Sequence, residues 1–278
     1  THSYHEGTHN YSIIFDVSQP VEAPATNYVN IGAGCSINVN SKGFGVSQGT
    51  GEGTDGDWDV GGGGGAYGGN GGTSEQGRSG GTAYANSTVE PYVLLYDVIK
   101  GPTYLGSGGG NSYSCSGGRG AGAVKITCAG AFTLDGTITA NADAGGTYSS
   151  YGAGGGGAGG SVWITASGAL SGAGSILANG GNGGDNGSDR GGGGAGGRIS
   201  VTYNGTVEEE PTPAMYCYGG TSGDWDGHGA AGTIYTKDTS SQTYGTLRIS
   251  NHTSSLWNGG QYNTANSGTP LFYMSDGN

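Results

Sequence analysis

An internal repeat constrains the fold of this chain more than any other feature of its sequence. Residues 122–141 (GAVKITCAGAFTLDGTITAN) and 160–179 (GSVWITASGALSGAGSILAN) align without a gap at an offset of 38. A partial third copy begins at Ala195, 37 residues after Ala158, and a weaker upstream copy covers residues 36–40. A repeat of this length is typical of stacked supersecondary units, each of which buries its apolar face against the next.

Apolar and polar residues alternate in short runs bounded by glycine, as in VKIT, SVWIT and GRISVTY. An alternation with period two predicts a β-strand that has one buried face. Strands that recur in stacked units pair in parallel with the equivalent strands above and below them. We therefore predict an all-β fold, a single parallel β-solenoid.

Glycine accounts for 67 of the 278 residues, whereas 32% of the residues are apolar and 11% are charged. This composition alone is typical of a flexible low-complexity segment, but the strand periodicity favours an ordered chain. Because glycine has no Cβ atom, neighbouring backbones can approach closely enough to hydrogen-bond. We expect the long glycine-rich loops to pack as extended segments similar to polyglycine II.

We divide the chain into an N-terminal extension (1–27), a glycine-rich repeat domain (28–251) and a C-terminal cap (252–278). The extension holds an apolar run that has no obvious hairpin partner. Such a run is either the first edge strand of the fold or a strand that pairs with another molecule, which predicts a homo-oligomer or filament. The residues of this candidate assembly strand are Ile13, Ile14, Phe15 and Val17.

Charge and hydropathy exclude two classes of interaction. The formal net charge is −12, from 9 basic and 21 acidic residues. Binding to nucleic acid needs clustered Lys and Arg, and no such cluster is present, so we expect no nucleic-acid partner. The chain has no run of about 18 apolar residues, so we expect no transmembrane segment.

Cysteines and glycosylation motifs are compatible with an extracellular protein. An even number of cysteines favours one or two disulfides in an oxidising compartment. Their wide spacing disfavours a zinc site and leaves the three pairings open. The four cysteines are Cys35, Cys115, Cys128 and Cys217. The candidate asparagines for N-glycosylation, each in an Asn-x-Ser/Thr motif, are Asn10, Asn86, Asn186, Asn204 and Asn251.

Two acidic loops, at residues 55–59 and 223–227, share the sequence GDWD. Alternating carboxylates in a glycine-rich loop can supply the oxygen ligands of Ca²⁺, the one cofactor that the sequence indicates. The alternative is a turn in which Asp caps backbone amides and Trp covers a neighbouring unit. The candidate ligands are Asp55, Asp57, Asp59, Asp224 and Asp226.

Three histidines near the N-terminus, His2, His5 and His9, form a further candidate site for a transition metal. A terminal segment lacks the surrounding groups that orient metal ligands, which disfavours this interpretation.

The repeat does not stack groups that could catalyse a reaction. β-Helical lyases and hydrolases need paired carboxylates, or a base beside a cation, on one exposed face. Here Asp135 aligns with Ala173, and Lys125 aligns with Trp163. We expect no catalytic residues and no enzyme activity. A carbohydrate-active β-helix remains a further alternative for the function.

Several of the 18 tyrosines lie next to glycine or serine, among them Tyr67, Tyr113, Tyr148 and Tyr151. Tyr combined with Gly, Ser and Asn makes adaptable binding surfaces, and flat rings suit sugars. This pattern indicates a glycan-binding surface. The alternative is that the rings shield the glycine-rich segments or fill contacts between subunits.

The order and spacing of five segments resemble glycine-rich repeat regions of large secreted or cell-surface proteins, mainly bacterial. The resemblance covers about residues 28–251. It implies a parallel β-solenoid, an extracellular location and a structural or adhesive role, without catalytic residues. The segments are YDVIKGPTYLGSGGG (96–110), GAGAVKITCAGAFTLDGTITANA (120–142), GAGGGGAGGSVWITASGALSGAGSILANGGNGG (152–184), GGGGAGGRISVTY (191–203) and AAGTIYTKDTSSQTYGTLRISN (230–251).

From these observations we expect an extracellular, non-enzymatic structural protein, a subunit or segment of a cell-surface fibre or adhesive surface. The first alternative is a glycan- or receptor-binding adhesin, which includes the tip proteins of viruses.

Overall fold

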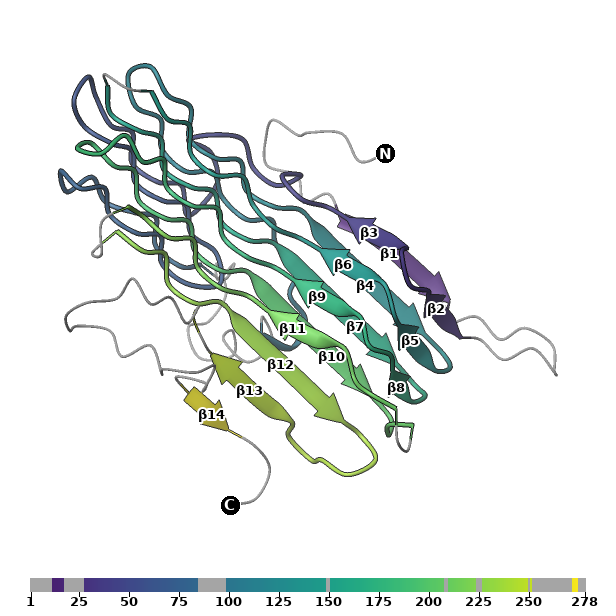
Figure 1. Ribbon diagram of the computed structural model, residues 1–278. Coiled ribbons are helices and arrows are strands. Elements are labelled where there is room, and N and C mark those ends of the chain that lie inside the picture. The colour runs from purple at the N-terminus through teal and green to yellow at the C-terminus, as the bar shows by residue number, and fades with distance from the viewer. Residues whose placement is uncertain are drawn as a thin grey trace.

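The computed structural model describes residues 12–17, 28–84, 99–148, 151–207, 210–223, 227–249, 251 and 272–274. The strands of successive repeat units lie side by side, and the glycine-rich segments extend from the strands toward one end of the molecule (Figure 1). The described strands form three sheets of seven, four and three strands.

The seven-stranded sheet contains, in spatial order, β1 (Ser12–Val17), β4 (Ala123–Cys128), β7 (Ser161–Ala166), β10 (Arg198–Tyr203), β12 (Thr233–Asp238), β13 (Thr246–Ile249) and β14 (Phe272–Met274). The four-stranded sheet contains β11 (Ala214–Tyr216), β9 (Ser175–Leu177), β6 (Thr137–Thr139) and β3 (Ser36–Asn38). The three-stranded sheet contains β2 (Val29–Ile31), β5 (Phe132–Leu134) and β8 (Leu170–Ser171).

The alignment of the repeat is confirmed as the register of strand pairing. Val124 of β4 pairs with Val162 of β7, and Ile138 of β6 pairs with Ile176 of β9. The upstream copy obeys the same rule, because Ile37 of β3 pairs with Ile138. All these pairs are parallel, and equivalent side chains therefore point to the same face.

The prediction of a single parallel β-solenoid was wrong. The described strands form three separate sheets, and the largest is mixed, because β13 pairs antiparallel with β12 and β14 pairs antiparallel with β13. The physical reason lies in the sequence after Asp238, where the repeat stops and a turn closed by the hydrogen bond from Gln242 N–H to the Asp238 carbonyl reverses the chain. Within each unit, the short strands are separated by turns and glycine-rich segments that belong to no sheet.

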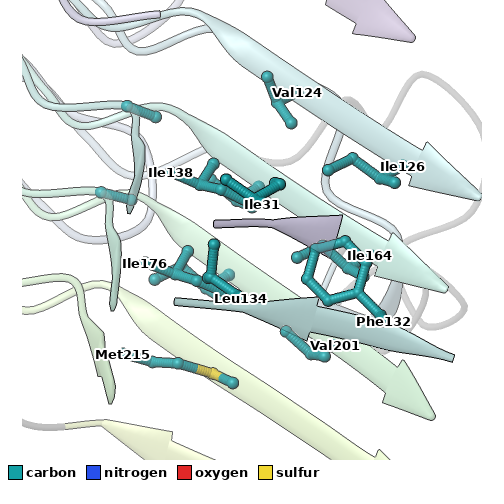
Figure 2. Close-up of a cluster of buried hydrophobic side chains, with 14 of the residues drawn as sticks. Ile31, Val124, Ile126, Phe132, Leu134, Ile138, Ile164, Ile176, Val201 and Met215 are labelled. Carbon is teal, nitrogen blue, oxygen red and sulfur yellow. The ribbon is translucent and has the colours of Figure 1, made fainter. Parts of the chain in front are cut away.

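One apolar core lies between the three sheets (Figure 2). The seven-stranded sheet contributes Ile126 and Ile164, the three-stranded sheet Phe132, and the four-stranded sheet Ile138 and Ile176. Each of these side chains is at most 1% exposed. Burial of a side chain of this size stabilises the fold by about 1.5–3 kcal/mol, so the rows of Ile along the repeat hold the units together.

The glycine-rich segments hydrogen-bond with a period of three residues. In residues 153–159, the first, fourth and seventh N–H groups donate to carbonyls of residues 189–195. The second and fifth donate to residues 143–146, and the third and sixth to residues 107–110. An extended segment with three residues per turn points successive N–H groups in three directions. The carbonyls of residues 153–159 accept N–H groups from three further segments, residues 62–65, 118–121 and 181–184. This segment therefore hydrogen-bonds to six neighbours, whereas a strand pairs with two in one plane.

This packing leaves no room for side chains. A Cβ atom on Gly155 would lie 1.9 Å from the carbonyl oxygen of Gly63, and one on Gly64 would lie 2.0 Å from that of Gly193. Both distances are far below a van der Waals contact. Glycine is required at these positions because the neighbouring backbones occupy the space of the missing Cβ.

Asparagine side chains connect the units where the four-stranded sheet meets the glycine-rich segments. The Oδ1 atom of Asn40 accepts the N–H of Asn141, and the Oδ1 atom of Asn141 accepts the N–H of Asn179, both at 2.8 Å. Asn179 accepts the N–H of Tyr218 in the same way, again at 2.8 Å. The repeated Asn of the sequence is thus a ladder that satisfies one backbone N–H in each successive unit.

Candidate functional site

Four aromatic side chains meet at the end of the glycine-rich segments. We call Trp58, Tyr113, Tyr148 and Tyr151 the aromatic cluster. The ring centroid of Trp58 lies 4.5 Å from that of Tyr113 and 4.7 Å from that of Tyr151. Tyr148 stacks on Tyr151 with the centroids 5.5 Å apart and the planes 13° from parallel. Trp58, Tyr113 and Tyr148 are nevertheless 51%, 61% and 53% exposed. Large rings that gather and stay exposed make this cluster the candidate binding surface of the described residues.

Backbone hydrogen bonds tie the loops of the cluster together. The N–H of Gly152 donates to the Trp58 carbonyl at 3.0 Å, and the N–H of Tyr113 donates to the Asp57 carbonyl at 3.4 Å. The Ser112 hydroxyl donates to the Gly152 carbonyl. These contacts fix the three loops relative to one another, so the positions of the rings follow from the backbone.

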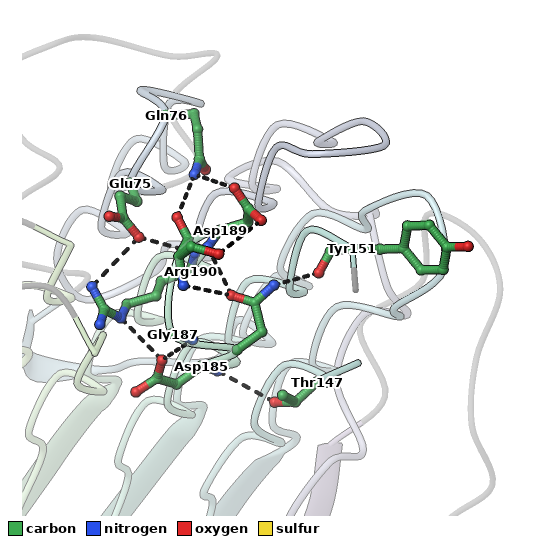
Figure 3. A network of polar contacts seen from close by, with 10 residues as sticks. Glu75, Gln76, Thr147, Tyr151, Asp185, Gly187, Asp189 and Arg190 are labelled. Atoms are coloured by element: carbon green, nitrogen blue, oxygen red, sulfur yellow. Dashed lines mark hydrogen bonds and ion pairs between the residues drawn. The ribbon is translucent and has the colours of Figure 1, made fainter. Parts of the chain in front are cut away.

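A polar network borders the aromatic cluster (Figure 3). The side-chain amide of Asn186 donates to the Tyr151 carbonyl. Arg190 contacts Asp185 through Nε at 3.0 Å and Glu75 through Nη1 at 3.5 Å. The loop of residues 184–190 is therefore joined both to the aromatic cluster and to the loop that carries Glu75.

Hydrogen bonds hold the Asp185 carboxylate in its charged form. The N–H of Gly187 donates to Asp185 Oδ1 at 2.9 Å, and the Arg190 guanidinium lies beside the same oxygen. These contacts lower the pKa of Asp185 below its ordinary value, with the Gly187 hydrogen bond as the larger cause. Asp185 is thus negatively charged at neutral pH.

The first acidic loop uses its carboxylates to fix backbone groups. Asp55 Oδ1 accepts the N–H of Asn111 at 2.7 Å and also the Ser47 hydroxyl, and Asp57 Oδ1 accepts the N–H of Trp58 at 2.9 Å. These contacts agree with the alternative to a Ca²⁺ site, a turn in which Asp side chains cap backbone amides. Across the described part of the chain, no group of three or more His, Cys, Asp or Glu side chains is arranged to hold a metal ion.

Parts of the metal predictions lie outside the described residues. Asp224 and Asp226 of the second acidic loop are among them, and so are His2, His5 and His9. Ca²⁺ binding at the second loop therefore stays a prediction.

The structure contains no disulfide among the four cysteines, in contrast to the expectation from their even number. Cys35 and Cys217 adjoin β3 and β11, which are the opposite edges of the four-stranded sheet. Three strand spacings separate these edges by about 14 Å, well beyond the reach of a disulfide. Cys128 ends β4 of the seven-stranded sheet, and its Sγ atom lies 3.4 Å from the Ala131 carbonyl oxygen. Burial raises the pKa of the Cys217 thiol to about 12.

The candidate glycosylation sites differ in their surroundings. Asn204 is exposed. The Asn186 amide donates to the Tyr151 carbonyl, and the Asn251 amide donates to the Gly229 carbonyl at 3.1 Å. Asn10 and Asn86 lie outside the described residues. Glycosylation stays a prediction, for which Asn204 is the most accessible of the described sites.

The candidate assembly strand is the edge strand β1. It pairs in parallel with β4 of its own chain, with Ile13 beside Val124 and Val17 beside Cys128. Ile13 packs against the core, whereas Ile14 and Phe15 are 62% and 42% exposed. The first of the two alternatives, an edge strand of the fold, is therefore what the structure contains. Pairing of the outer edge of β1 with another molecule stays a prediction.

Tyr67 does not belong to a binding surface. Its ring is completely buried, and its hydroxyl forms a 2.7 Å hydrogen bond with Ser161 Oγ. The guanidinium of Arg198, itself 3% exposed, lies 4.7 Å from the centroid of the Tyr67 ring. For Tyr67 the alternative of a ring that shields the glycine-rich segments is correct, because the ring covers the outer face of the seven-stranded sheet.

Sequence reasoning missed two parts of this site. In the turn alternative Trp58 covers a neighbouring unit, and the structure places its ring against Tyr113 and Tyr151 in an exposed cluster that the sequence did not indicate. The network around Arg190 was not expected at all. The GDWD motif marks the loop of Trp58 without indicating which rings it meets, and no motif marks the network around Arg190.

A scan against protein-family models finds no matching family, and searches of curated proteins and of solved structures find no match. None of the described segments forms a helix with the length and apolar character needed to span a bilayer.

Proposed function

We propose that this protein is an extracellular, non-enzymatic binding module that holds carbohydrate on the aromatic cluster. One observation carries the proposal, namely that rings from loops distant in the sequence gather at the surface and remain about half exposed. Tyr and Trp combine a flat apolar face with a polar group. These two properties match the C–H face and the hydroxyl groups of a sugar ring.

The glycine-rich segments support this proposal as a scaffold. Their hydrogen bonds hold residues 55–60, 111–116 and 151–152 in one arrangement. Loops that are ordered before the ligand arrives lose little conformational entropy on binding. The resemblance to repeat regions of cell-surface proteins favours an adhesive role for such a module.

The test is a glycan array followed by titration calorimetry with the best ligand. Trp58→Ala, and Tyr148→Ala combined with Tyr151→Ala, should each weaken binding by about tenfold or more, because central aromatic residues dominate such interfaces. Tyr28→Ala is the matched control, since Tyr28 is 59% exposed and lies outside the aromatic cluster. Folded cluster variants that bind glycans as well as the parent protein would refute the proposal.

Self-association is a second candidate function, favoured by the edge strand β1. Among the described strands, β1 pairs with β4 alone, and it exposes Ile14 beside its outer edge. An exposed apolar edge is a template for pairing with a second chain. Ile14→Lys should shift an oligomer toward monomer in sedimentation velocity, whereas Val207→Lys, an exposed site elsewhere, should not. A parent protein that is monomeric at all concentrations would exclude this candidate.

A further inference from the structure

The charges around the aromatic cluster restrict the carbohydrate that it can take. We infer that the cluster selects basic oligosaccharides, whose amino sugars carry ammonium groups, over neutral and acidic ones. This inference rests on the proposed function, because it names the ligand class of the same site.

Carboxylates outnumber cations in the loops that surround the aromatic cluster. The loops of residues 55–60, 74–78 and 184–190 carry six carboxylates and two arginines. Arg190 is already engaged by Asp185 and Glu75. The remaining arginine of these loops is Arg78, which is half-buried. An acidic sugar would therefore be repelled by a surface that carries the same negative charge.

Two of the carboxylates lie directly beside Trp58 in the chain. Asp57 and Asp59 are its sequence neighbours, and both are exposed. A cation near the ring gains attraction from each carboxylate, about threefold in affinity per charge at a separation of some 6 Å in water. An ammonium group placed over the face of Trp or Tyr gains a further cation–π attraction. Aromatic rings and carboxylates thus favour the same occupant.

The geometry of the rings favours a sugar over a basic peptide. Tyr148 and Tyr151 stack nearly parallel, and Trp58 meets Tyr151 edge-on, so each exposed ring is held in place by its neighbours and the surface is ordered in advance. A rigid pyranose can lie on such a surface with little loss of entropy, whereas a lysine side chain must be immobilised.

The experiment compares three hexasaccharides of equal length at about pH 6, where Asp is ionised and amino sugars are protonated. The probes are the hexamers of glucosamine, N-acetylglucosamine and galacturonic acid. The glucosamine hexamer should bind about tenfold more tightly than the N-acetylglucosamine hexamer, and the galacturonic acid hexamer should bind least. At about 1 M salt the difference should fall to about twofold, because the Debye length shrinks to about 3 Å.

Charge variants connect this preference to the site. Asp57→Asn combined with Asp59→Asn should remove most of the preference, because both charges are lost while the size of each side chain is kept. Glu210→Gln is the control, because Glu210 is exposed and lies between β10 and β11, outside the loops around the cluster. It should leave the preference intact. A preference that survives loss of both aspartates would overturn the inference.

The remaining outcomes separate the inference from the proposed function. If the neutral or acidic hexamer binds as tightly as the basic one, and Trp58→Ala abolishes both, the inference fails and the proposed function stands. If no hexamer depends on Trp58, the proposed function fails as well. If hexalysine binds as tightly as the glucosamine hexamer and does not depend on Trp58, the surface recognises basic peptides and the inference is overturned.

Discussion

The missing Cβ of glycine decides, residue by residue, how closely the extended segments can approach. Gly155 lies among the packed glycine-rich segments, and an added methyl group there would come within 1.9 Å of the Gly63 carbonyl oxygen. Gly32, in contrast, lies in a turn with nothing within 4 Å of the corresponding position. The two sites differ in packing and not in residue type.

Gly155→Ala should therefore destabilise the fold by about 3 kcal/mol or more, through overpacking against a backbone that cannot move away. Gly32→Ala should be neutral or stabilising by up to about 1 kcal/mol, because it restricts the unfolded chain. Urea unfolding followed by circular dichroism measures both. Equal effects of the two substitutions would contradict the packing described for the glycine-rich segments.

The buried thiol of Cys217 predicts a loss of stability at alkaline pH. Burial raises its pKa from 9.0 to about 12, so the folded state keeps a proton that the unfolded state loses above about pH 9. The stability from this group is complete below pH 9. It falls between about pH 9 and pH 12 by at most about 1.4 kcal/mol per pH unit.

Urea unfolding at a series of pH values measures this slope. Cys217→Ala should show a shallower decline than the parent protein. Tyr84, whose pKa is also raised by burial, titrates in both proteins and therefore cancels in the comparison. Identical slopes in the two proteins would show that the Cys217 thiol does not titrate abnormally.

Alternation with period two governs the strands. In β9, Ile176 is fully buried in the row that joins Ile138 and Met215, whereas its neighbour Leu177 lies on the outer face and is half-buried. The same strand thus offers a core position and a surface position one residue apart.

Ile176→Ala should lower the free energy of unfolding by about 2–5 kcal/mol, because it leaves a cavity between two fixed rows. Leu177→Ala should have a clearly smaller effect, since the outer face is partly open to solvent. Thermal or urea unfolding of both variants checks the order. A larger effect at Leu177 would show that Leu177, and not Ile176, faces the core.

The strands and the extended, polyglycine-II-like form of the glycine-rich segments could be predicted from the sequence, but the neighbours of each segment could not. The repeat fixes the register of β4, β6, β7 and β9, because equivalent Ile and Val residues must share a buried row. In runs of glycine every residue is alike, so the sequence does not say which segments become neighbours. β13, which pairs antiparallel with β12, lies beyond the repeat and gave no comparable signal.

The same limit explains what was missed at the candidate site. Tyr148 and Tyr151 were expected in a binding surface together with Tyr113, but nothing in the sequence joins them to Trp58. Their contact depends on how the glycine-rich segments between them pack. Tyr67 has similar glycine neighbours and is nevertheless buried, so local sequence did not separate exposed rings from buried ones.

The whole molecule is held together by the apolar core and by backbone hydrogen bonds, without covalent cross-links. The apolar core holds the strands of successive units together. The glycine-rich segments have almost no side chains to pack, and hydrogen bonds from one segment to the next hold them together instead. None of the four cysteines is in a disulfide, so we expect this stability not to depend on redox conditions.

Dithiothreitol should accordingly leave the melting temperature unchanged within about 1 °C, whereas loss of a structural disulfide would lower stability by about 2–5 kcal/mol. Differential scanning calorimetry with and without the reductant checks this. Iodoacetamide labelling of the native protein is the control, and it should modify the exposed Cys35 well before the buried Cys217. A large drop in melting temperature would show that cysteines are bridged in solution.

The three-residue hydrogen-bond period means that the length of a glycine-rich segment matters in steps of three residues. Removing one residue from positions 153–159 would turn every later N–H group by about a third of a revolution, toward the wrong neighbour. Removing three residues would restore the phase. Such segments can therefore lengthen or shorten by three residues at a time. The loops at their ends then keep the same orientation.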